Sequence, residues 1–194
     1  MAALAYKYSE PRFTYGDYVQ WTGDERYELI DGVVYDLSPA PRRRHQGILV
    51  ALALQIGAFL KDKPCKLYVA PFDVRLPDAD EADEKVRTVV QPDLVVVCDP
   101  SKLDEAGCRG APDFVVEIIS PSTSVKDQTT KTALYERHGV KEYWLIHPMD
   151  NLLIIRLLGP DGKYGAPLIR EGKGRAAVAT LPGLDVDLDA VFAT

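Results

Sequence analysis

A chain of 194 residues is long enough for one domain with a substantial hydrophobic core. Its hydrophobic fraction of 46% and charged fraction of 27% are typical of a soluble globular protein. The longest apolar runs, LVVV and WLI, are far too short to span a bilayer, so we expect no membrane partner. The net charge of −6 argues against a uniformly basic nucleic-acid-binding surface, although an acidic protein can bind DNA through an uneven charge distribution. Five carboxylates gather in residues 78–84, whereas Arg42–Arg44 form a basic cluster.

The cysteines and the N-terminal sequence indicate a compartment. The stretch MAALAYKYSEPRF lacks the long apolar core and small-residue cleavage site of a secretion signal. Cys65, Cys98 and Cys108 are odd in number and widely spaced, and no C-x-x-C pair suggests a disulfide framework or a zinc ribbon. We therefore expect a cytoplasmic protein with reduced thiols that are buried or inert.

The N-terminal third contains a short helix, a hairpin and a long helix. Thr14 followed by Asp17 is typical of a helix N-cap, and a short helix to about Trp21 follows from it. The segment RYELIDGVVYDLS predicts a β-hairpin, because Asp31-Gly32 is a strong two-residue turn signal. Residues 44–60 show helical spacing of their apolar side chains and predict an amphipathic helix with a broad buried face, formed by Ile48, Leu49, Leu52, Ile56, Phe59 and Leu60.

The rest of the chain alternates strands, loops and one further helix. Continuous apolar runs predict strands buried on both faces, and Gly139 is a plausible helix C-cap. The expected strands are 66–69, 72–76, 94–98, 114–119, 142–146 and 152–158, with loops at 78–85 and 100–110, a helix at 125–138, and Gly-rich, short strand-like pieces from 159 onward. This order predicts an α/β (α+β) fold with a mixed sheet flanked by helices, in a single domain over 1–194 whose core covers about 13–158.

Two acidic residues accompany consecutive apolar strands, and a lysine follows them on the next predicted helix. Asp93 lies in VQPDLVVV, Glu117 in DFVVEIIS and Lys131 in KDQTTKTALYERHGV. Two carboxylates and a lysine brought together can hold a divalent metal and activate a water for phosphodiester hydrolysis. These residues therefore form the first candidate site.

Each of the three residues also has a structural interpretation. Asp93 follows Pro92 and could cap the start of a strand. Glu117 lies in an apolar run, so it needs a metal, a basic partner or a sheet edge that faces water. Lys131 lies four residues after Asp127 and four before Tyr135, so it could form an ordinary surface pair with Asp127.

Two further polar residues could complete the site. Glu28 lies in the first strand of the predicted hairpin, and His45 lies at the start of the long helix. Either could serve as a metal ligand or a proton-transfer group. The alternatives are an outward-facing strand residue for Glu28 and a polar residue at a helix start for His45. No G-x-S-x-G elbow, phosphate-binding loop or histidine pattern of a zinc site is present.

The order and spacing of several segments resemble a bacterial family of restriction endonucleases within the PD-(D/E)XK nuclease superfamily. The matching segments are RYELIDGVVYDLSPAP, the following His45, QPDLVVV, DFVVEIISPSTS, Asp127 with Lys131, HGVKEYWLIHP and the closing LPGLDVDLDAVF. The resemblance implies a restriction-endonuclease-like core with an N-terminal hairpin extension and a C-terminal extension over 159–194.

The resemblance also implies roles for individual residues. Asp93 and Glu117 would bind Mg²⁺ or Mn²⁺, with the backbone carbonyl of Ile118 facing the same metal, and Glu28 and His45 would line the pocket. The sequence departs from the superfamily pattern at one position, because Ile119 stands where the lysine two residues after the glutamate is expected. Lys131 on the following helix fits a migrated lysine.

The first functional hypothesis is a metal-dependent DNA endonuclease that uses Asp93, Glu117 and Lys131, with help from Glu28 and His45. The acidic net charge and Ile119 motivate a second hypothesis, a non-catalytic module that binds nucleic acid or protein on the same fold. A third is a metal-assisted phosphoester hydrolase that acts on a small substrate. Because cleavage of both DNA strands often uses two symmetric sites, we also expect a homodimer.

Overall fold

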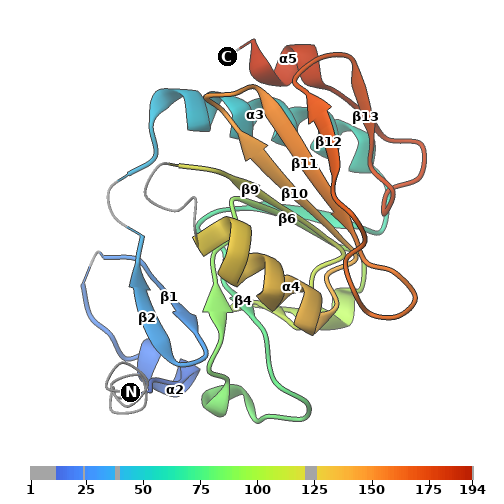
Figure 1. Ribbon diagram of the computed structural model, residues 1–194. Coiled ribbons are helices and arrows are strands. Elements are labelled where there is room, and N and C mark those ends of the chain that lie inside the picture. The colour runs from blue at the N-terminus through green and yellow to red at the C-terminus, as the bar shows by residue number, and fades with distance from the viewer. Residues whose placement is uncertain (1–11, 24, 38–39, 121–125, 194) are drawn as a thin grey trace, which may run out of the picture. The chain divides into compact units, whose positions relative to one another are not determined.

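A computed structural model describes residues 12–23, 25–37, 40–120 and 126–193 (Figure 1). The chain divides into two compact units, and each is described on its own. The first unit comprises Met1–Ala40 with Arg75–Val90, and the second comprises Pro41–Val74 with Gln91–Thr194. Val125, which opens a predicted helix, and residues 121–124 of the DFVVEIISPSTS segment lie outside the described residues.

The first unit contains the predicted hairpin and the predicted short helix. Strands β1 (Tyr27–Ile30) and β2 (Val33–Asp36) are antiparallel, and Asp31 and Gly32 both have positive φ angles at the turn. Helix α2 (Tyr15–Tyr18) begins with a capping box between Thr14 and Asp17. Strand β5 (Val89–Val90) pairs with β1, and a 3₁₀ turn occupies Asp83–Lys85. The two local signals therefore predicted α2 and the hairpin correctly, whereas β5 was not predicted and the 3₁₀ turn lies in a segment expected to be a loop.

The second unit is built on a six-stranded sheet in the order β12-β11-β10-β9-β6-β3. Strands β9 and β10 are parallel, whereas the other neighbouring pairs are antiparallel. The strands are β3 (Lys66–Val69), β6 (Leu94–Val97), β9 (Phe114–Ile118), β10 (Glu142–His147), β11 (Leu152–Leu157) and β12 (Leu168–Glu171). The predicted mixed sheet is confirmed.

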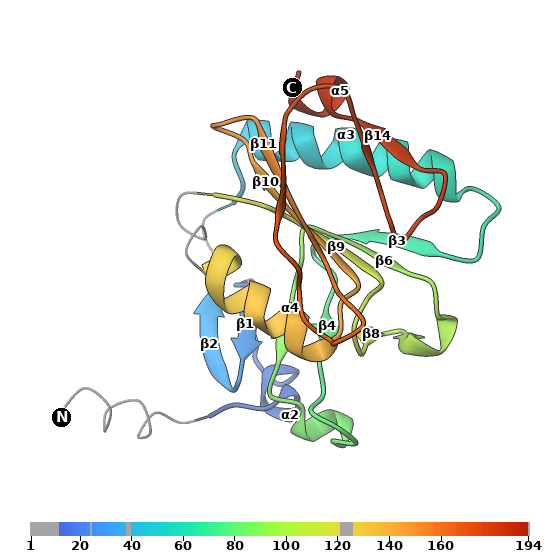
Figure 2. The ribbon, with the colours of Figure 1, turned by 45° about the vertical axis from the view of Figure 1, so that its right-hand side comes forward.

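Two helices lie on opposite sides of this sheet (Figure 2). Helix α3 (Arg43–Leu60) buries Ile48, Leu52 and Ile56 against the strands, as its apolar spacing predicted. Side chains alternate between the two faces of a strand. Phe114, Val116 and Ile118 of β9 therefore join the core beneath α3, whereas Glu117 points to the other face, where helix α4 (Thr132–His138) lies. The alternation places Glu117 toward α4.

The C-terminal segment is part of the core of the second unit. It contains strands β13 (Arg175–Ala177) and β14 (Asp185–Asp187) and helix α5 (Leu188–Phe192). Its buried side chains share one hydrophobic cluster with α3 and the sheet: Ala176, Val178, Leu181, Leu184, Val186, Leu188, Val191 and Phe192. The fully buried carboxylate of Glu142 on β10 accepts bonds from the backbone N–H and the hydroxyl of Thr180. The sequence predicted short strands here but not α5.

Three predicted segments differ from the structure. The expected loop at 100–110 contains a 3₁₀ turn (Pro100–Lys102) and a short hairpin of β7 (Leu103–Asp104) and β8 (Gly107–Arg109). Gly107 has a φ of 126°, and a Cβ there would lie 2.2 Å from the carbonyl oxygen of Asp73, so only glycine fits. The strand expected at 72–76 is limited to β4 (Val74–Arg75). The helix expected at 125–138 begins with a π-helical turn over Lys126–Lys131.

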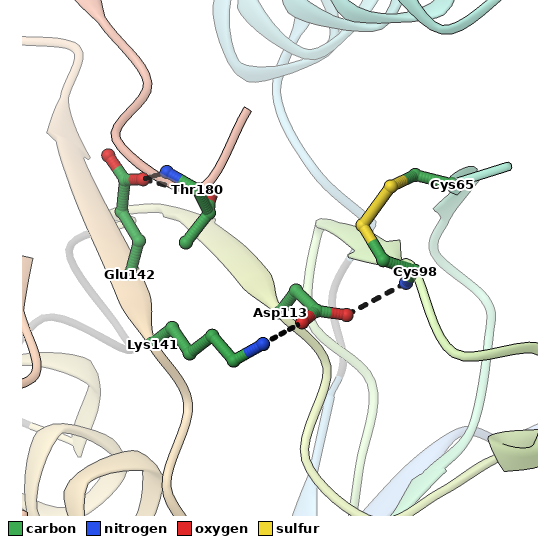
Figure 3. The surroundings of a disulfide bond; sticks show 6 residues. All are labelled: Cys65, Cys98, Asp113, Lys141, Glu142 and Thr180. Carbon is green, nitrogen blue, oxygen red and sulfur yellow. Dashed lines mark hydrogen bonds and ion pairs between the residues drawn. A yellow bond between two sulfur atoms is a disulfide. The ribbon is translucent and has the colours of Figure 1, made fainter. Parts of the chain in front are cut away.

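The prediction of reduced, inert thiols is wrong for two of the three cysteines. Cys65 and Cys98 form a disulfide, whereas Cys108 is free and buried (Figure 3). The register that pairs Lys66 with Val97 places Cys65 directly opposite Cys98, one residue beyond the ends of β3 and β6. Asp113 accepts a hydrogen bond from the Cys98 backbone N–H at 2.7 Å and one from the Lys141 Nζ at 2.6 Å. The separation of 33 residues gave no sign of this cross-strand pairing.

Candidate functional site

The register of the sheet brings Asp93 beside Glu117. Strands β6 and β9 are antiparallel, with Leu94 opposite Val116, so the next position along the ladder pairs Asp93 with Glu117. The bond from the Ala70 N–H to the Asp93 carbonyl shows that the β3 side of the ladder also continues to Asp93. Two residues that are 24 positions apart in the sequence therefore lie at one end of the sheet.

Both carboxylate oxygens of Asp93 have defined partners. Oδ2 accepts a hydrogen bond from the backbone N–H of Ile118 at 2.7 Å, and Oδ1 lies 3.1 Å from Nε2 of His45. The side chains of His45 and Asp93 retain 11% and 17% of their exposure. The bond to Ile118 agrees with the strand-capping interpretation of Asp93, and it ties the Asp93 carboxylate to the backbone of the residue that follows Glu117. His45, in the first turn of α3, joins the same cluster.

Glu117 is held by two donors from the helical segment above it. Oε1 accepts from Lys131 Nζ at 2.7 Å and from the Tyr135 hydroxyl at 2.8 Å. Strand β9 is central in the sheet and Glu117 is 4% exposed, so the sheet-edge interpretation is wrong. Asp127 and Lys131 are both buried, and Lys131 Nζ lies 3.8 Å from Asp127 Oδ1. The two residues therefore do not form an ordinary surface ion pair. A buried carboxylate paired with a buried ammonium avoids the large cost of an isolated charge.

The π-helical turn positions these donors. Lys131 ends this turn and Tyr135 follows one turn later in α4, so both side chains reach the same oxygen of Glu117. π-helical turns are rare and frequently occur at functional sites. Tyr143 of β10 packs edge-on against Tyr135, and its hydroxyl donates to the Asp127 carbonyl at 3.1 Å. Burial, and then the charge of Glu117, raise the pKa of Tyr143 well above its usual value, so its phenol stays protonated.

Glu28 belongs to the first unit, where it is fully buried in β1. The interpretation of Glu28 as an outward-facing residue is therefore wrong. Its participation in the site with the other four residues stays a prediction. Within the second unit, His45 contacts Asp93 and Lys131 contacts Glu117, while the Ile118 backbone links Asp93 to the strand that carries Glu117.

The donor set has the chemistry of a hard-cation site. Among the described residues, no group of three His, Cys, Asp or Glu side chains is arranged to hold a metal. Mg²⁺, however, keeps several waters and commonly uses only one or two carboxylates together with substrate oxygens. Asp93 and Glu117 supply two carboxylates from opposed positions just before β6 and within β9, and the backbone N–H of Ile118 donates to Asp93. The metal-ligand roles of all three residues stay predictions.

One member of the cluster was not predicted as a site residue. Tyr135 was expected only to share a helix face with Lys131, yet its hydroxyl contacts the candidate catalytic carboxylate directly. The spacing of four residues between Lys131 and Tyr135 was the available signal, because residues so spaced lie on one side of a helix. Nothing in the sequence indicated which strand that side would face.

Comparison with known proteins gives the family. A family model described as "Putative restriction endonuclease", named Uma2, matches residues 15–189. The chain belongs to the Uma2 family. The match of this Uma2 chain spans both units and every site residue named above, which confirms the resemblance drawn from the sequence motifs.

Two individual proteins are similar to this Uma2 chain. The "Uncharacterized protein slr1290" of Synechocystis sp. (strain ATCC 27184 / PCC 6803 / Kazusa) is 25% identical over 138 residues, which cover 70% of this chain and 68% of that protein. A crystal structure from Anabaena variabilis ATCC 29413, described as a putative nuclease belonging to DUF820, superposes with a TM-score of 0.73 at 18% identity. The superposition covers 93% of this chain and 98% of that one, and it shows a shared fold.

Proposed function

We propose that this protein is a metal-dependent DNA endonuclease. The observation that carries the proposal is the buried ion pair of Lys131 with Glu117, whose Nζ and Oε1 are 2.7 Å apart, on a strand whose register puts the Asp93 backbone opposite Glu117. The family description and the description of the Anabaena variabilis protein both name a nuclease, which supports the same reaction class.

The side chains take complementary roles in the proposed reaction. Asp93, Glu117 and the Ile118 carbonyl would hold Mg²⁺ or Mn²⁺, and a bound ion would polarise the phosphate and lower the pKa of a water. Lys131 donates to the phosphate and stabilises the negative charge that develops in the transition state. His45, oriented by Asp93 at 3.1 Å, is positioned to accept or return a proton. Glu28 is proposed as an additional polar group of the pocket.

The proposal also covers how the protein binds DNA, its oligomeric state and its localisation. DNA would be bound through its phosphates, and Arg42–Arg44 provide a concentrated positive charge directly before His45 in an otherwise acidic chain. A homodimer would present two sites to the two strands of a duplex. We also propose that the protein is cytoplasmic. Among the described residues, no helix is long and apolar enough to cross a membrane.

Purified wild type, Glu117→Ala and Glu171→Ala provide the test. Each is incubated with supercoiled plasmid and with single-stranded DNA in Mg²⁺, Mn²⁺ or EDTA. Glu171 is exposed on β12, so its variant is a matched loss of one carboxylate outside the site. We expect cleavage by wild type and Glu171→Ala, no cleavage in EDTA, and none by Glu117→Ala. Undiminished metal-dependent cleavage by correctly folded Glu117→Ala would refute the assignment.

The occupation of the superfamily lysine position by Ile119 favours a second candidate, a non-catalytic nucleic-acid or protein interaction module. Ile119 is almost completely buried, and its uncharged side chain cannot stabilise the negative charge of a substrate phosphate. Titration with Mn²⁺ separates the two functions. A nuclease should bind the ion in a manner that depends on Glu117, whereas an interaction module should show no such site.

A further inference from the structure

The hydroxyl of Tyr135 contacts the candidate site from a fully buried position. It donates to Oε1 of Glu117 at 2.8 Å, and Lys131 Nζ donates to the same oxygen at 2.7 Å. Both donors come from one continuous helical segment, Lys126–His138. Two buried hydrogen bonds to one oxygen fix the rotation of the carboxylate far more firmly than either bond would alone.

The two donors differ in what they can do during a reaction. Lys131 has a flexible four-carbon stem and an ammonium with three N–H groups, so it can turn toward a substrate phosphate. Tyr135 has a rigid aromatic stem that is held by edge-on contact with Tyr143 at a centroid distance of 4.9 Å. If the Lys131 ammonium turns toward a phosphate, the Tyr135 hydroxyl still donates its hydrogen bond to Oε1 of Glu117.

The position of the shared oxygen also affects metal binding. Lys131 and Tyr135 both donate to Oε1, so together they set the rotation of the Glu117 carboxylate that a bound metal would meet. The hydrogen-bonding partners behind a metal ligand orient that ligand and tune its affinity for the metal.

We propose that Tyr135 is a positioning residue that holds the Glu117 carboxylate in its metal-binding orientation while Lys131 engages the substrate. This inference rests on the proposed nuclease function. Tyr135 transfers no proton and does not contact the substrate. Tyr135 acts through Glu117, as the hydrogen-bonding partners behind metal ligands generally do.

The test compares Tyr135→Phe with Tyr143→Phe. Both remove one hydroxyl from a fully buried ring, and the two rings touch each other, so the change in packing is matched. The Tyr143 hydroxyl bonds to the Asp127 carbonyl rather than to Glu117. Mn²⁺ affinity is measured by isothermal titration calorimetry on the purified full chain, with far-UV circular dichroism as a check on folding.

For Tyr135→Phe we expect Mn²⁺ affinity to fall about tenfold, which is the lower end of the loss seen when the partner of a metal ligand is removed. DNA cleavage should need a correspondingly higher Mn²⁺ concentration and should recover its maximal rate at saturation. Tyr143→Phe should keep its affinity within about twofold, because its hydroxyl does not touch the ligand. A purely structural role would lower the unfolding midpoint without changing the Mn²⁺ requirement.

Unchanged affinity in folded Tyr135→Phe, or equal losses in both variants, would overturn the inference and leave the nuclease proposal intact. Wild type that binds no Mn²⁺, or binds it equally well after Glu117→Ala, would overturn both. A Glu117-dependent Mn²⁺ site without DNA cleavage would uphold the positioning role if Tyr135→Phe weakens that site, and would contradict the nuclease proposal alone.

Discussion

Nε2 of His45 lies 3.1 Å from Oδ1 of Asp93 and connects the first turn of α3 to the residue that precedes β6. The other ring nitrogen, Nδ1, is buried and has no hydrogen-bond partner among the described residues. One side of the imidazole is therefore oriented by a candidate metal ligand. This arrangement fixes the ring relative to Asp93, as expected of a proton-transfer or orienting group.

His45→Ala should reduce DNA cleavage by at least about tenfold, because a positioned acid–base or orienting group typically contributes that much or more. The unfolding free energy should also fall, by about 1–3 kcal/mol, since the contact with Asp93 is largely buried. Initial cleavage rates and urea denaturation measure the two effects. His147→Ala is the control, because a ring nitrogen of His147 is also buried and has no hydrogen-bond partner in the described part of the chain. Equal activity losses in both variants would contradict a specific role for His45.

Arg42–Arg44 should contribute to DNA affinity. They begin α3 with no acidic residue in its first turn, and positive charge at a helix N-terminus is unfavourable unless an anion offsets it. Arg44 donates to Asn151 at 2.6 Å, and no described carboxylate pairs with Arg42 or Arg43. Replacing all three with glutamine should weaken duplex binding and reduce the slope of log affinity against log salt by up to about three.

Fluorescence anisotropy with a labelled duplex in EDTA measures this binding without cleavage. The matched control removes three positive charges from the other end of α3 and the start of β3 through glutamine substitutions at Lys61, Lys63 and Lys66. This control should keep most of the affinity and the salt slope. If both triple variants lose affinity equally, binding depends on net charge and not on the arginine cluster.

The Cys65–Cys98 disulfide should contribute to the stability of the protein. It closes a loop with a sequence separation of 33, and the chain-entropy model assigns a loop of this size roughly 3–4 kcal/mol. Dithiothreitol should therefore lower the urea midpoint of wild type. The double variant Cys65→Ala/Cys98→Ala should have the lower urea midpoint both with and without dithiothreitol. A midpoint that is insensitive to reduction in wild type would contradict this contribution.

Glu136 should make stability depend on pH in the acidic range. The Tyr164 backbone N–H at 2.7 Å and Lys163 hold the pKa of Glu136 below its usual value of 4.5. Because the folded-state pKa is lowered, the stabilisation is present above 4.5 and is lost as pH falls through the folded pKa. Glu136→Gln should therefore flatten the decline of the urea midpoint below that pH. An unchanged decline in the variant would show that other carboxylates cause it.

Much of the fold could be predicted because its signals are local. Asp31-Gly32 specified the hairpin, the spacing from Ile48 to Leu60 specified α3, and the continuous apolar runs specified β6 and β9. Each signal depends on one residue or a short window, so it can be recognised without knowledge of the tertiary structure. Helix α5 was missed because five residues are too few to show a period.

The missed features depend on register between distant segments. Asp93, Glu117 and Lys131 could be named from their positions on or beside apolar segments and from the family resemblance. The contact of Tyr135 with Glu117 and the pairing of Cys65 with Cys98 follow from the packing of α4 on β9 and the alignment of β3 with β6. A shift of one residue in either register would remove those contacts, and the sequence contains no local marker of that register.

The place of residues 176–192 in the core has a consequence for synthesis on the ribosome. Phe192 and Val191 pack in the same cluster as Ile48 and Trp144, so the hydrophobic core lacks part of its packing until residues 191 and 192 have been translated. Strands of the sheet that leave the ribosome earlier expose apolar surface until then, and such surfaces favour aggregation and chaperone binding. The nascent chain is therefore vulnerable to aggregation in the interval after the site residues have left the exit tunnel and before residues 176–192 have left it.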